Sequence, residues 1–150
     1  MSELKDRLKN DLTTAIKARD TVRTGTLRMV IAAISTEEAA GSTQRSLDDD
    51  EIITLLTREA KKRKEAAEAF DKGGRAEQAA AERAESEVIS DYLPAQLSDE
   101  ELSQLVAAAI AETGAEGPRA MGQVMKVVNP QIAGRAEGAR VAAEVKRQLA

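Results

Sequence analysis

The stretch from Ser86 to Leu102, SEVISDYLPAQLSDEEL, decides how this chain folds. Pro94 ends the helix that precedes it, because a proline pushes the residue before it toward extended geometry. Ser98 then opens a new helix, since its side chain can cap the helix and a Glu stands three residues later, as in a capping box. The chain is therefore expected to form two helical domains, residues 1–95 and residues 96–150.

Composition favours helices in both parts. The chain has 150 residues, the size of one domain or of two small ones. It is rich in Ala, Glu, Lys, Arg and Leu, and aromatic residues make up only 1% of it, which favours helices over sheets. We expect an all-α protein with an N-terminal domain of about four helices, including a long helical hairpin, and a small C-terminal three-helix domain.

Apolar spacing and breaking residues place the four N-terminal helices at residues 2–19, 20–40, 47–72 and 75–93. The first is expected to bury a stripe of Leu4, Leu8, Leu12 and Ile16. Gly41 is expected to form the C-terminal cap of the second helix. Two consecutive glycines, Gly73 and Gly74, should break the chain between the third and fourth helices, which we expect to pack as a hairpin.

The C-terminal domain is expected to hold three short helices. Gly114 ends the first, and Pro118 suits the first turn of the second. Asn129 and Pro130 are expected to terminate that second helix. The third should run from about Ala136 to Leu149. The side chains expected inside these helices are Met121, Val124, Met125, Val128, Val141, Val145 and Leu149.

The residue types exclude most catalytic chemistry. There is no His and no Cys, which removes the commonest general base, the thiolate nucleophile and nearly every zinc or copper site. GxSxG, Walker and GxGxxG motifs are absent as well. We therefore expect no catalytic residues, no cofactor and no metal. The glycines of the segment from Gly134 to Gly138 resemble a phosphate loop, but an interhelical turn explains them equally well.

A charged N-terminus and the lack of a long apolar stretch predict neither a signal peptide nor a membrane span. We expect a cytoplasmic protein without a membrane partner.

Charge separates by position near the end of the chain. From Gly117 onward six Lys and Arg stand against two Glu, whereas the whole chain has a net charge of −4. A local excess of positive charge favours a polyanion such as RNA. The candidate RNA-binding residues are Arg119, Lys126, Arg135, Arg140 and Lys146. The same charges could instead offset the acidic helix before them or complement a helix C-terminus, and the pattern alone does not decide between these interpretations.

The long hairpin carries charges of both signs between Arg58 and Glu87. Glu59 and Arg63, for example, stand four residues apart in the order that stabilises a helix. This pattern is typical of a solvated helix face, and a contact surface for a partner is the alternative.

Three segments together resemble a known family: RMVIAAI at residues 28–34, SEVISDYLPAQLSDEEL at residues 86–102, and MGQVMKVVNPQIAGRAEGARVAAEVKRQL at residues 121–149. They are similar to the YqeY-like (GatB/YqeY) proteins, which are related to the C-terminal tail of the B subunit of glutamyl/aspartyl-tRNA amidotransferase. The GRADG turn usual in that family reads GRAEG here, so that Glu137 replaces a shorter capping carboxylate.

The resemblance implies an α-helical domain pair whose smaller part is similar to the region that touches tRNA in the amidotransferase. Its implied function is a non-catalytic module for tRNA binding or amidotransferase association. The implied partners are tRNA, an amidotransferase or another translation-related protein. Two alternatives stay open: an accessory subunit of a carbon-nitrogen ligase with glutamine as amido-N-donor, and a protein-interaction module that uses the charged hairpin.

Overall fold

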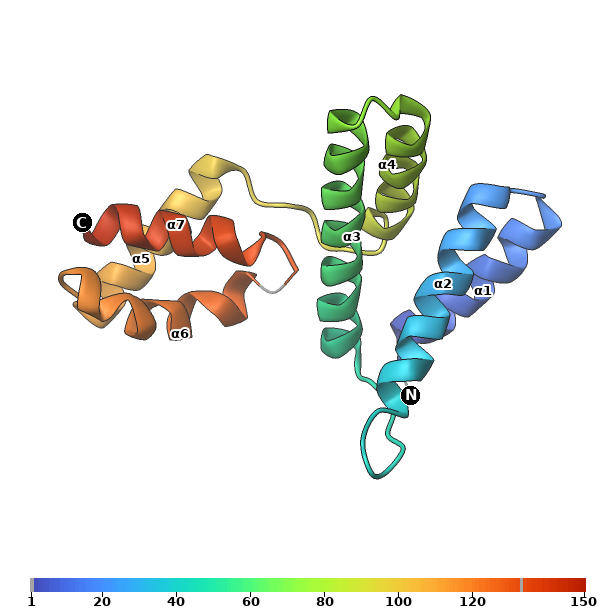
Figure 1. Cartoon of the computed structure of the whole chain (residues 1–150). Coiled ribbons are helices and arrows are strands. Elements are labelled where there is room, and N and C mark those ends of the chain that lie inside the picture. The colour runs from blue at the N-terminus through green and yellow to red at the C-terminus, as the bar shows by residue number, and fades with distance from the viewer. Residues whose placement is uncertain (1, 133) are drawn as a thin grey trace. The chain divides into compact units, whose positions relative to one another are not determined.

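The computed structural model describes residues 2–132 and 134–150, and every regular element in these ranges is a helix (Figure 1). The elements are α1 (Glu3–Lys17), α2 (Thr21–Glu38), α3 (Asp49–Lys72), α4 (Ala76–Ser90), α5 (Asp99–Thr113), the 3₁₀ helix η1 (Pro118–Ala120), α6 (Met121–Ile132) and α7 (Gly138–Leu149). The expectation of an all-α protein is confirmed.

The chain divides into two compact units, Met1–Leu93 and Pro94–Ala150, here called the N-terminal unit and the C-terminal unit. Each contains its own cluster of buried apolar side chains. That the expected domains, residues 1–95 and 96–150, fold separately stays a prediction.

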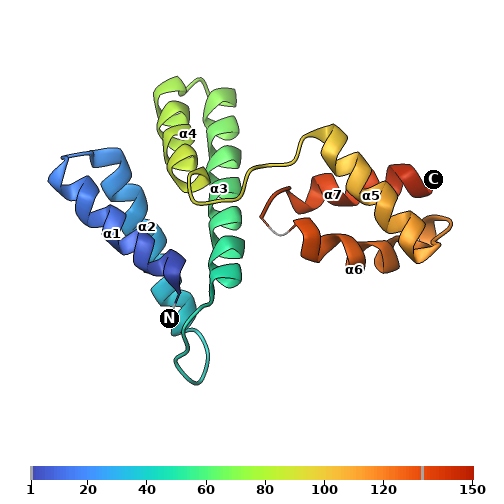
Figure 2. The ribbon, with the colours of Figure 1, turned by 180° about the vertical axis from the view of Figure 1, so that it is seen from behind.

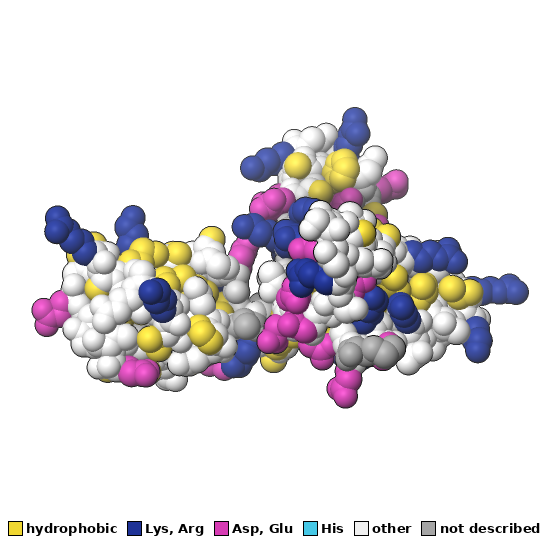
Figure 3. Space-filling model, turned by 90° about the horizontal axis from the view of Figure 1, so that it is seen from below, with side chains coloured by type: hydrophobic (Ala, Val, Ile, Leu, Met, Phe, Trp, Pro, Cys, Tyr) yellow, Lys and Arg dark blue, Asp and Glu magenta, His cyan; other side chains and the backbone are white. Residues whose placement is uncertain are grey.

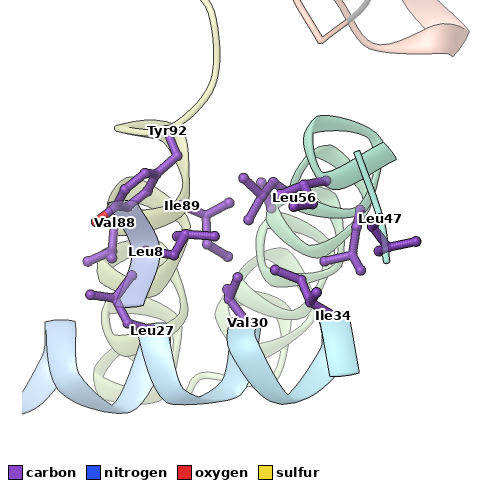
Figure 4. Packing of buried hydrophobic residues seen from close by; sticks show 12 residues of the cluster. Leu8, Leu27, Val30, Ile34, Leu47, Leu56, Val88, Ile89 and Tyr92 are labelled. Atoms are coloured by element: carbon purple, nitrogen blue, oxygen red, sulfur yellow. The ribbon is translucent and has the colours of Figure 1, made fainter. Parts of the chain in front are cut away.

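Two helical hairpins make up the N-terminal unit (Figures 1 and 2). α1 packs against α2, and α3 packs against α4. The chain reverses between α3 and α4 at Gly73 and Gly74, and Gly74 has a φ of 72°, which glycine adopts without steric cost. The hairpins enclose aliphatic side chains from all four helices and the loop before α3 (Figure 4), among them Leu8, Leu27, Val30, Ile34, Leu47, Leu56, Val88 and Ile89.

Polar side chains fix the starts of the first three helices. The side chains of Ser2 and Asp20 accept hydrogen bonds from backbone N–H groups in the first turns of α1 and α2. Asp48 caps α3 and forms a reciprocal capping box with Glu51. These contacts satisfy N–H groups that have no partner inside the helix.

Two expectations for the N-terminal unit are wrong. Ile16 is not in the buried stripe of α1: Ala15 is buried in its place, and 46% of the surface of Ile16 is exposed. Gly41 does not cap α2, which ends at Glu38 and is followed by Ala39 in right-handed geometry. The buried carboxylate of Glu38 organises this loop instead, because it accepts hydrogen bonds from Lys5 Nζ at 2.7 Å and from the backbone N–H of Leu47 at 3.0 Å.

In the C-terminal unit, α5 begins and ends as expected. Ser98 and Glu101 form the reciprocal capping box at its start. Gly114 follows its last residue in left-handed geometry, with a φ of 64°. Pro118 lies in the 3₁₀ helix η1, immediately before α6. The buried core contains side chains from α5, α6 and α7: Leu102, Val106, Val124, Val128, Ile132, Val141, Val145 and Leu149.

The prediction that Asn129 and Pro130 terminate the second helix of the C-terminal domain is wrong. Pro130 lies inside α6, which continues to Ile132. Pro130 has no N–H to donate to the helix, and its ring crowds the carbonyl oxygen four residues earlier. Continuing the helix buries Ile132 against the core to 4% exposure, and this burial offsets the loss. α7 begins at Gly138, slightly later than expected.

The sole tyrosine, Tyr92, joins the end of the second hairpin to α1. Its hydroxyl donates a hydrogen bond to Asp11 Oδ2 at 2.5 Å, and the Arg7 guanidinium lies 4.6 Å from the centre of its ring. Burial, reinforced by the hydrogen bond to Asp11, raises the pKa of Tyr92 from 10.0 to about 12.

Ionisation of Tyr92 should therefore show a midpoint near pH 12 in the folded protein and near 10.0 after unfolding in denaturant. Between these values the unfolded state releases a proton that the folded state keeps, so stability should fall as pH rises through this window. Ultraviolet absorbance of the tyrosinate measures the ionisation midpoint in the folded and in the unfolded protein, because the chain has no Trp that would absorb as well. A midpoint near 10.0 in the native protein would contradict the burial of this hydroxyl.

Limited proteolysis tests whether the two units fold separately. Ala95 and Gln96 are exposed and lie outside any helix, so a non-specific protease should cut there first and leave two helical fragments. Mass spectrometry identifies the cut, and circular dichroism of the separated fragments measures their helicity. Fragments that are unfolded, or first cuts inside α3 or α6, would contradict separate folding.

Candidate nucleic-acid interface

Three of the five candidate RNA-binding residues point into solvent. Arg119 lies in η1, Lys126 in α6 and Lys146 in α7, and all three are exposed. η1 packs against α6 and α7, and α6 packs against α7, so the three elements are neighbours. Within the described residues, none of the three side chains makes an ion pair or a hydrogen bond. Their charges are therefore available to a ligand.

Arg135 instead connects the turn before α7 to the extended segment 95–97 before α5, and we call this connection the joint. Its Nε donates a hydrogen bond to the Ala95 carbonyl oxygen at 3.2 Å, and its own carbonyl oxygen accepts one from the Leu97 N–H at 2.8 Å. Nearby, Gln96 Nε2 donates to the Gly134 carbonyl oxygen at 2.8 Å. These bonds satisfy backbone groups of the extended segment before α5, which has no helix or sheet to satisfy them.

Arg140 serves the same joint from the first turn of α7. Its Nη2 donates to the Leu97 carbonyl oxygen at 3.0 Å and lies 2.9 Å from Asp99 Oδ1. The guanidinium thus ties α7 to the N-terminal end of α5. Arg135 and Arg140 are engaged inside the protein, and only the exposed remainder of each could meet a ligand.

The last turn of α7 is also fixed by side chains. Arg147 pairs with Glu144, and the Gln148 amide donates to Glu144 Oε1 at 2.7 Å and to the Ser103 carbonyl oxygen of α5 at 2.9 Å. Hydrogen bonds from Arg147 and then Gln148 lower the pKa of Glu144 to about 2. The charge of Arg147 is therefore balanced by Glu144 on the same helix, and Arg147 does not add to the unpaired positive charge.

The C-terminal unit as a whole is not basic. Between Pro94 and Ala150 there are six Lys and Arg and seven Asp and Glu, so its net charge is −1. Five of the acids precede Gly117, and all six cations follow it. On the face that Figure 3 shows, cationic and acidic side chains are interspersed, with apolar side chains exposed between them. A polyanion would meet a few separate cations here.

Several charges of the α3–α4 hairpin are paired within the N-terminal unit. Arg63 Nη1 lies 2.8 Å from Glu59 Oε2, which confirms the predicted pair. Arg63 Nε lies 3.4 Å from Glu85 Oε2 of α4, although it is buried without a well-formed hydrogen bond. Arg58 pairs with Glu37 of α2 at 2.8 Å. The first pair lies within α3, whereas the other two join α3 to α4 and to α2.

In the ranges that the structure describes, no group of three or more acidic side chains is arranged to hold a metal ion. None of the helices in these ranges has the length and apolar character needed to cross a bilayer.

A family model described as Yqey-like protein matches residues 5–149 of this chain. The chain belongs to the YqeY-like family. The match includes both units and therefore agrees with the resemblance seen in the sequence. No curated protein matches the chain.

Local patterns in this YqeY-like protein did not reveal the roles of Arg135 and Arg140. Their partners, Ala95, Leu97 and Asp99, lie about forty residues earlier in the chain, whereas helix patterns compare residues three or four apart. One available signal was the extended segment after Pro94, whose backbone groups required partners from elsewhere. The sequence does name Arg119, Lys126 and Lys146 as candidate RNA-binding residues, and all three are exposed.

The two groups of cations should differ in their effect on stability. Arg140→Ala removes a hydrogen bond to the Leu97 carbonyl and should lower the free energy of unfolding of the YqeY-like protein by about 1 kcal/mol. Lys146→Ala, on the same helix, should change it by less than about 0.5 kcal/mol. Urea denaturation followed by circular dichroism compares them. Equal effects would show that Arg140 does not hold the joint.

Proposed function

We propose that this protein is a non-catalytic binding module that contacts tRNA through Arg119, Lys126 and Lys146 of its C-terminal unit. The observation that carries the proposal is that these three cations are exposed, lie on neighbouring elements and make no ion pair or hydrogen bond among the described residues. The resemblance of the chain's last third to the amidotransferase tail supports tRNA as the polyanion.

Contacts of this kind neutralise phosphates. A Lys or Arg that reaches a phosphate releases a counterion, so the affinity depends on salt concentration and little on base sequence. With Phe and Tyr at one residue each and no Trp, the chain has few rings on which bases could stack. Recognition should therefore depend on the spacing of phosphates in a folded RNA.

The absence of His, Cys and recognisable nucleophile motifs supports a binding role without catalysis. Such a role fits a protein that serves a tRNA-dependent amidotransferase or another translation complex. The alternative of an accessory subunit of a carbon-nitrogen ligase stays a prediction. Part of the hairpin charge is paired within the N-terminal unit, and the alternative of a hairpin docking surface also stays a prediction.

Titration of tRNA tests the proposal in full-length protein. The variant Arg119→Ala/Lys126→Ala/Lys146→Ala should bind weakly, and the slope of log affinity against log salt should fall in magnitude by about three. A matched control, Lys9→Ala/Lys64→Ala/Lys72→Ala, removes the same charge from exposed positions of the N-terminal unit. Fluorescence anisotropy of labelled tRNA over a range of salt concentrations measures both.

The control should retain most of the wild-type affinity. Equal loss in the two variants would show that net charge, and not this group of cations, governs binding. If wild type does not bind tRNA at near-physiological salt, the proposal is wrong.

A further inference from the structure

The turn between α1 and α2 exposes two large apolar side chains. Among the described residues of this kind, Ile16 is 46% exposed and Val22 is 47% exposed, whereas those of the cores are buried. Val22 follows Ile16 by only six positions, across the turn that joins the two helices. The tip where α1 meets α2 therefore leaves two aliphatic side chains largely uncovered by the fold.

A hollow lies at this tip, beside Ile16. Ile16 of α1 and Gly25 of α2 both line it, with Thr21 and Thr24 between them. A Cβ at Gly25 would meet nothing within 4 Å, so neither packing inside the protein nor a left-handed backbone requires a glycine here. Glycine is also among the least favourable residues in a helix interior. Its bare backbone leaves room for a side chain from another molecule to approach closely.

The same tip is positively charged. Lys17, Arg19 and Arg28 are exposed, and none makes an ion pair or a side-chain hydrogen bond within the described part of the chain. Arg23 differs, because it pairs with Asp91 at 2.8 Å. From Ile16 to Arg28 there are four cations and one Asp, in a chain whose net charge is −4. Arg19 and Arg28 both line the hollow.

We propose that the α1–α2 tip, residues 16–28, docks an acidic amphipathic helix of a partner protein. An apolar side chain of the partner lies over Gly25 and against Ile16. Carboxylates on either side of it pair with Arg19 and Arg28. This arrangement places apolar anchors and complementary charges as helix-binding grooves do. The inference does not rest on RNA binding, which we assign to other residues.

The apolar groups distinguish this partner from other polyanions. A phosphate backbone would pair with the three cations but would leave Ile16 and Val22 in water and would not need the hollow. A lipid surface would bury the aliphatic side chains, but it has no protruding group to fill the space over Gly25. A helix with Glu beside Leu satisfies all of these features together.

A synthetic helical peptide with Leu on one face and Glu on both flanks serves as the probe, and the same peptide with Lys in place of Glu is its control. Fluorescence anisotropy of the labelled peptides with full-length protein measures binding. The acidic peptide should bind to wild type and the basic one should not. Gly25→Leu fills the hollow and should weaken binding about tenfold or more.

Gly122→Leu is the matched control for this variant. Gly122 also lies in a helix where an added Cβ would meet nothing within 4 Å, but in the C-terminal unit, so its replacement should leave the affinity unchanged. Arg19→Asn/Arg28→Gln should also weaken binding about tenfold, and Asn suits the positive φ of Arg19, 59°. Circular dichroism checks that each variant keeps its helicity.

Three outcomes would overturn the proposal. The acidic peptide could fail to bind to wild type, or it could bind to Gly25→Leu as tightly as to wild type. In the third, tRNA or vesicles of phosphatidylcholine and phosphatidylglycerol bind in its place, and Arg19→Asn/Arg28→Gln abolishes that binding. The tip would then be a nucleic-acid or lipid site.

Discussion

The hydrogen bond from the Leu97 N–H to the Arg135 carbonyl oxygen, at 2.8 Å, is the contact around which the C-terminal unit is arranged. Three short helices bury little apolar surface, so their relative positions depend strongly on how the connecting segments are held. This bond brings the segment before α5 to the turn before α7. Ser98 then caps α5, and Arg140 reaches the Leu97 carbonyl from α7.

Features determined within a few residues could be predicted from the sequence, and features determined by distant contacts could not. The capping box at Ser98 and the break at Gly74 are local, and both are present. Pro130 does not end α6, because the burial of Ile132 outweighs the local tendency of proline to break a helix. The same limit applies to the candidate site. Exposure of Lys126 follows from helix periodicity, whereas the engagement of Arg140 depends on residues far away in the chain.

Charged side chains in this protein have two distinct roles. Some connect chain segments inside a unit, as Glu38 does by accepting hydrogen bonds from Lys5 and from the backbone of Leu47. Others, such as Lys126 and Arg28, have no partner among the described residues. The unpaired cations occur in both units, but among the described residues those at the α1–α2 tip lie beside the exposed aliphatic side chains Ile16 and Val22. Together the two proposals describe an adaptor between RNA and an acidic protein.

The position of Tyr92 divides the protein optically. It is the sole tyrosine, there is no Trp, and the single Phe, Phe70, also precedes Leu93. Intrinsic fluorescence therefore arises from the N-terminal unit alone, with the Tyr92 hydroxyl next to a quenching carboxylate, Asp11. The C-terminal unit is spectroscopically silent in this respect. A single tryptophan introduced there would report on the C-terminal unit, and the native tyrosine emission would report on the N-terminal unit.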